Sequence, residues 1–135
     1  MKKRFLDANV IVRFLLNDEK NQAKKAKDFF ETTVKNKEKL VITPLVLAEV
    51  IYVLEKFGQA SKEEISKILI SFLNLPTIIV EEKKILLDAL LLHSKMKIDF
   101  VDCYHLSLCQ NFGIEEIVSF YKDFKKASFV KLVSP

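Results

Sequence analysis

The chain has 135 residues, half of them hydrophobic, and a formal net charge of +4. This length and composition fit one globular domain with a sizeable core, so we predict a single domain over residues 1–135. Apolar runs fall short of the roughly 20 residues of a membrane span, and polar residues interrupt the stretch after the basic N-terminus, which excludes a membrane partner and a typical signal peptide. The expected location is therefore the cytoplasm.

Short strands alternate with helices along the chain. Hydrophobic periodicity and capping residues predict, in chain order, a strand at 4–7, helices at 9–16 and 21–36, a strand at 39–42, helices at 44–57 and 61–73, a strand at 77–80, helices at 81–95 and 99–112, and strands at 117–119 and 129–133. Two helix starts carry clear signals: Thr43 as N-cap before Pro44, and a capping box at residues 61–64. This alternation predicts an α/β fold with a central, mostly parallel sheet of four to five short strands flanked by helices. Ligands of such sheets bind beyond the carboxyl ends of the strands.

Glu49 is the one charged residue in the apolar stretch 40–54. An ionised carboxylate costs several kcal/mol to bury without compensation. Glu49 therefore either points to water or faces a site that contains a cation. In the second case Glu49→Gln would abolish metal binding and leave the fold at least as stable, because an unpaired buried charge is removed.

Other acids follow the predicted strands. Asp7 and Asn9 lie where the first strand gives way to a helix, and either could simply cap that helix. Asp99 could likewise be an N-cap, with Asp102 in the first turn, where the helix dipole favours an anion. Each residue taken alone has this ordinary structural explanation.

Taken together, the acids indicate a site. Asp7, Asp102 and Asp123 are expected near one edge of the sheet, and Glu49 lies in the second turn of the helix that starts at the same edge. Converging carboxylates raise one another's pKa values, and a divalent cation relieves their repulsion. All-oxygen ligands suit Mg²⁺ or Mn²⁺, which activate water and neutralise charge on a phosphodiester.

Four segments resemble PIN-domain ribonucleases, and most closely the VapC-like toxins of type II toxin–antitoxin systems. These segments are residues 6–16 (LDANVIVRFLL), 47–50 (LAEV), 98–103 (IDFVDC) and 119–124 (SFYKDF). The resemblance covers essentially the whole chain and implies a PIN-like three-layer sandwich. It also implies Mg²⁺- or Mn²⁺-dependent hydrolysis of RNA by an acidic tetrad.

The resemblance also assigns roles to residues. It makes Asp7, Glu49 and Asp102 the first three acids and the metal ligands, and Asp99 an accessory acid. Asn9 and Ser119 match positions that orient ligands or water. A cognate antitoxin protein and a homodimer are implied as partners besides RNA.

One position departs from the family pattern, because Tyr121 stands where the fourth acid usually lies. A phenol with a pKa near 10 is a poor Mg²⁺ ligand. Asp123 could substitute as a catalytic acid, or Asp7, Glu49 and Asp102 could hold a single metal. The leading hypothesis is a metal-dependent endoribonuclease toxin, and the alternative is a non-catalytic module that binds RNA or a protein.

Overall fold

The computed structural model describes residues 2–135, which divide into two compact units, 2–81 and 82–135. The fold is mixed α/β, with six α-helices and parallel strands, as the sequence predicts. The prediction of a single domain over the whole chain stays a prediction.

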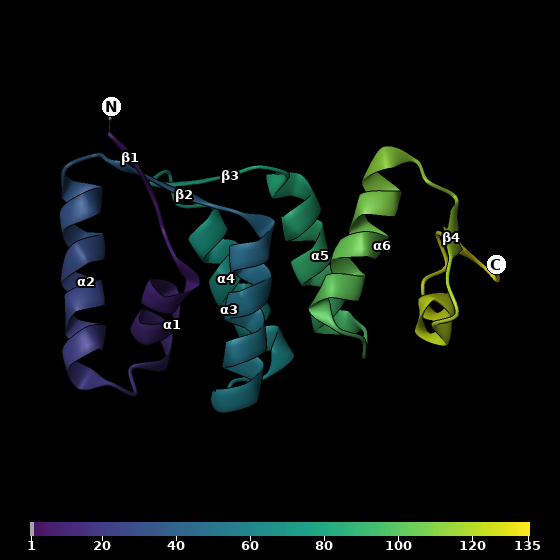
Figure 1. Cartoon of the computed structure of the whole chain (residues 1–135), viewed down its shortest axis with the longest axis horizontal. Coiled ribbons are helices and arrows are strands. Elements are labelled where there is room, and N and C mark those ends of the chain that lie inside the picture. Colours follow the sequence, from purple (N-terminus) through teal and green to yellow (C-terminus); the bar gives the residue numbers. More distant parts are fainter. Residues whose placement is uncertain (1) are drawn as a thin grey trace. The chain divides into compact units, whose positions relative to one another are not determined.

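The first unit is a three-stranded parallel sheet with four helices (Figure 1). Its elements are β1 (Lys3–Phe5), α1 (Ala8–Leu16), α2 (Lys20–Lys35), β2 (Lys39–Ile42), α3 (Pro44–Phe57), α4 (Lys62–Leu73) and β3 (Ile78–Val80). The strand order is β1-β2-β3, and the register aligns Phe5 with Val41 and Ile42 with Val80. The carboxyl ends of the three strands therefore form one edge, from which α1 and α3 start.

The second unit contains a helix pair and a two-stranded parallel sheet. Its elements are α5 (Lys83–Lys95), α6 (Phe100–Phe112), β4 (Glu116–Val118), the 3₁₀ helix η1 (Lys122–Lys126) and β5 (Lys131–Val133). The five strands expected for one sheet are thus found as a sheet of three and a sheet of two. The helical turn at Lys122–Lys126 was not among the predicted elements.

Local chemistry explains where the helices start. The Thr43 side chain accepts a hydrogen bond from the backbone N–H of Val46 at 3.2 Å, and Pro44 occupies the first helical position. Ser61 and Glu64 form the predicted capping box, in which each side chain accepts a hydrogen bond from the other residue's backbone N–H. Both start signals are confirmed.

Each unit has buried apolar side chains of its own. In the first unit Leu40, Leu47 and Leu69 are at most 1% exposed. In the second unit Leu106 and Phe124 belong to one buried cluster, which joins α6 to η1 and the residues around β5. Among residues 2–135, no helix is long and apolar enough to cross a membrane.

Candidate active site

Asp7 lies two residues beyond β1, at the edge where the parallel strands end. It is the N-cap of α1, and its Oδ2 accepts a hydrogen bond from the Asn9 backbone N–H at 3.2 Å. The capping role is therefore confirmed. Asp7 and Asn9 are both exposed, so the Asp7 carboxylate keeps capacity for a ligand from solvent.

Glu49 lies in the second turn of α3, which starts from the same sheet edge as α1. Its side chain is exposed, as in the first of the two alternatives, so Glu49→Gln would not remove a buried charge. Leu45 and Tyr52, at positions i−4 and i+3, are 81% and 61% exposed, so Glu49 lies between two exposed hydrophobic side chains on the surface of α3. An exposed carboxylate needs no compensating cation, but it remains available to one.

The second unit brings together three of the predicted acids. Asp99 is the residue before α6, and Asp102 lies in the first turn of that helix. Burial raises the pKa of Asp102 above its ordinary value, and the negative charges of Asp99 and Asp123 raise it further, whereas His105 opposes them. Three carboxylates that influence one another in this way favour a bound cation.

Tyr121 makes a short hydrogen bond with Asp123. The phenol Oη donates to Asp123 Oδ2 at 2.6 Å, and Lys126 Nζ lies 3.5 Å from Oδ1 of the same carboxylate. These contacts hold the pKa of Asp123 below its usual range, and the bond to Asp123 raises the pKa of Tyr121 to about 12. Tyr121 is therefore a neutral donor at neutral pH.

Ser119 fixes the backbone of the turn between β4 and η1. Its Oγ accepts a hydrogen bond from the Tyr121 N–H at 2.9 Å, and its own N–H donates to the Val133 carbonyl at 3.0 Å. Ser119 thus determines the direction in which the chain presents Tyr121 and Asp123. The contacts that Tyr121 and Lys126 make with Asp123 were not predicted. The three-residue spacing of Asp123 and Lys126 on a helical turn is the sequence signal that could have predicted the lysine contact.

The predicted acids are therefore divided between the units, with Asp7 and Glu49 in the first and Asp99, Asp102 and Asp123 in the second. Among residues 2–135, no three His, Cys, Asp or Glu side chains are arranged to hold a metal ion. The donor chemistry nevertheless fits one, because every candidate is a carboxylate and because burial, together with neighbouring negative charges, raises the pKa of Asp102. Hard divalent cations such as Mg²⁺ or Mn²⁺ suit this donor set.

Comparisons with known proteins identify the family. The PIN domain model matches residues 4–130. The chain belongs to the PIN-domain family. A VapC ribonuclease of Aquifex aeolicus is 33% identical over 132 residues, covering 98% of this chain and 96% of the relative.

Among solved structures, VapC20 of Mycobacterium tuberculosis, described as a sarcin–ricin-loop-cleaving toxin, matches with a TM-score of 0.43 at 20% identity. The match covers 98% of this chain and 99% of that one.

Proposed function

We propose that this PIN-domain protein is a metal-dependent endoribonuclease and the toxin of a toxin–antitoxin pair. The full-length similarity to the VapC ribonuclease of Aquifex aeolicus carries the proposal. The acids at the strand and helix ends support it, because they are the residue types that phosphodiester hydrolysis requires. A cognate antitoxin, a homodimer and a cytoplasmic location belong to the same proposal.

Asp7, Glu49 and Asp102 would hold Mg²⁺ or Mn²⁺. The ion would supply a water nucleophile at neutral pH and neutralise charge that builds on the phosphodiester. Asp99 adds negative charge beside Asp102, which strengthens attraction for a cation. Asp123, held by Tyr121 and Lys126, is the additional acid of the second unit.

The polar residues next to these acids orient groups at the site. The exposed Asn9 follows Asp7 on the first turn of α1 and offers an amide that can donate to a phosphate oxygen or a water. Ser119 positions the turn that carries Asp123. Lysines on the helix surfaces would hold the RNA backbone by charge.

A second function is favoured by one specific contact. Because Tyr121 occupies the usual fourth-acid position and its phenol binds Asp123, the second unit offers one charge fewer than the family pattern. The chain could then bind RNA or its protein partner without cleaving RNA.

RNA cleavage in Mn²⁺ or Mg²⁺ tests the two functions. The wild type, Asp7→Asn and Tyr121→Asp are compared, with Asp28→Asn as a control that removes the same charge from the exposed face of α2. We expect cleavage by the wild type and the control, and a loss of about 100-fold in Asp7→Asn. Activity that survives Asp7→Asn unchanged would contradict the proposed site. An inactive wild type that gains activity in Tyr121→Asp would establish the binding module.

A further inference from the structure

A pocket of about 480 Å³ lies in the first unit, between β1, α1 and α2. This volume is in the range of sites that hold small organic molecules. Arg4, Arg13, Gln22, Lys25 and Phe29 line its walls together with Asp7, the first of the proposed catalytic acids. A molecule that occupies the pocket would therefore lie directly beside Asp7.

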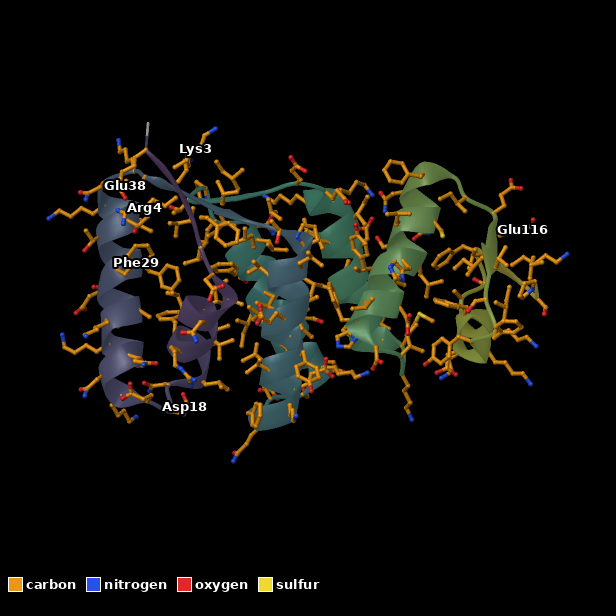
Figure 2. The ribbon with its side chains drawn as sticks, viewed as in Figure 1. Lys3, Arg4, Asp18, Phe29, Glu38 and Glu116 are labelled. Atoms are coloured by element: carbon orange, nitrogen blue, oxygen red, sulfur yellow. The ribbon has the colours of Figure 1, made fainter. Side chains whose placement is uncertain are left out.

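One wall of the pocket is a cation stacked on an aromatic ring. The guanidinium carbon of Arg4 lies 5.4 Å from the centroid of the Phe29 ring, and Arg4 also forms an ion pair with Glu38 (Figure 2). The ion pair and the ring together hold the guanidinium plane in one place. Phe29 and Arg4 thus offer a flat, half-buried surface of the kind on which nucleobases stack.

The two arginines that line the pocket have some donors that are paired and some that lack acceptors. Arg13 Nη1 is paired, because it donates to both carboxylate oxygens of Asp18, at 3.1 and 3.2 Å. The buried Nε atoms of Arg4 and Arg13 have no hydrogen-bond partner within residues 2–135. A buried donor without an acceptor costs free energy, so walls that carry two such guanidiniums suit a ligand rich in oxygen and nitrogen acceptors.

Lys25 gives the pocket a positive charge that attracts an anion, on a lining whose one acid is Asp7. Arg4 and Arg13 are each matched by a carboxylate, whereas the exposed Lys25 has no ion-pair partner in the part of the chain that the structure describes. An unpaired lysine beside apolar and aromatic walls suits a ligand with a flat base and a negative phosphate. An apolar protein segment would leave both the lysine and the arginine donors unmatched.

We propose that this pocket receives one unpaired nucleotide of the RNA, adjacent to the phosphate that is cleaved. The base stacks against Phe29 and Arg4, the Gln22 amide contacts its edge, and Lys25 contacts its backbone phosphate. The inference rests on the proposed nuclease function, because Asp7 connects the pocket to that site. It adds a determinant of base preference that lies outside the acidic residues.

Binding without metal tests the pocket separately from catalysis. Fluorescein-labelled RNA hexamers of A, C, G or U are titrated with the full chain in EDTA at several salt concentrations, and anisotropy is measured. Phe29→Leu removes the ring but keeps apolar volume, whereas Gln22→Ala and Lys25→Gln alter exposed residues. The charge-matched control is Lys67→Gln, an exposed residue of α4 that does not line the pocket.

Each variant has a distinct expected result. Phe29→Leu should weaken hexamer binding about ten-fold, since base stacking on an aromatic ring is lost. Gln22→Ala should change the order of the four affinities. Lys25→Gln should weaken all four hexamers and reduce the slope of log K against log[salt] by about 0.7, whereas Lys67→Gln should leave that slope unchanged.

Two results would overturn the inference. One is hexamer binding by folded Phe29→Leu and Gln22→Ala that equals the wild type for all four bases. The other is unchanged RNA binding together with weaker binding of a protein partner, which would assign the pocket to that partner. A wild type that binds hexamers in the expected pattern but cleaves no RNA would support the pocket and contradict the nuclease function.

Discussion

Two substitutions on α3, Glu49→Gln and Leu47→Ala, should distinguish a residue that binds metal from a residue that stabilises the fold. Leu47 is 0% exposed, so its truncation should cost about 2–5 kcal/mol of unfolding free energy. Glu49 is exposed, and neutralising an exposed residue changes the free energy of unfolding by at most about 0.5 kcal/mol. The two variants should therefore differ several-fold in their effect on stability when metal is absent.

Mn²⁺ should show the opposite contrast, because the metal-induced gain in stability should depend on Glu49 and not on Leu47. At a concentration 100 times the dissociation constant, a ligand specific for the folded state stabilises it by about 2.7 kcal/mol. If loss of the Glu49 carboxylate weakens binding 100-fold, that gain falls to about 0.4 kcal/mol at the same Mn²⁺ concentration. Leu47→Ala should keep the full gain, provided that it remains folded.

Urea unfolding followed by far-ultraviolet circular dichroism, in EDTA and in Mn²⁺, measures both quantities. Two outcomes would refute the reasoning. Glu49→Gln could keep the full Mn²⁺-induced gain, in which case Glu49 is not a ligand. It could instead lose more than about 1 kcal/mol in EDTA, in which case the exposed position of its side chain is wrong.

Two further predictions concern the second unit. Tyr121→Phe removes the donor that holds the Asp123 pKa low, so that pKa should rise towards its ordinary value in carboxyl-detected NMR. A group whose pKa is lower in the folded state stabilises the fold above its unfolded pKa, and this stabilisation is lost as the pH falls through the folded pKa. Tyr121→Phe should therefore be less stable than the wild type near neutral pH and equally stable in strong acid. Gly113 ends α6 at φ +69° with open space around its Cα, so only backbone strain opposes a side chain there. Gly113→Ala should therefore lower the free energy of unfolding by about 1 kcal/mol in thermal unfolding, and Gly113→Asn should lower it less.

The features that the sequence predicted well are set by neighbouring residues. Thr43 and Ser61 start their helices as expected, because a cap depends on a side chain and a backbone N–H two or three residues away. The strand 39–42 and the helix 44–57 have the predicted bounds, and the other predicted elements differ by one or two residues at one or both ends. Asp7 likewise caps α1, which is a local property of the first turn.

The exposure of Glu49 could not be predicted, because it depends on which face of α3 the rest of the chain covers. In a helix that is apolar on nearly every side, hydrophobic periodicity does not identify the outer face. Leu45 and Tyr52 are exposed with Glu49, so here the apolar residues do not mark the buried side. One charge in an apolar sequence was therefore poor support for a buried charge, although the carboxylate itself remains a candidate ligand.

The contact between Tyr121 and Asp123 could not be predicted from the residue type at position 121 alone. A phenol in place of a carboxylate predicts only that a metal ligand is lost. In the structure the phenol instead donates to Asp123, so it helps to keep a neighbouring acid ionised without adding a charge of its own. Burial and two neighbouring carboxylates already raise the pKa of Asp102, so a fourth acid nearby would add repulsion that only a bound cation could offset. Tyr121 therefore reduces the electrostatic repulsion within this acidic cluster when no metal is bound, but it also weakens the attraction of the cluster for a second cation.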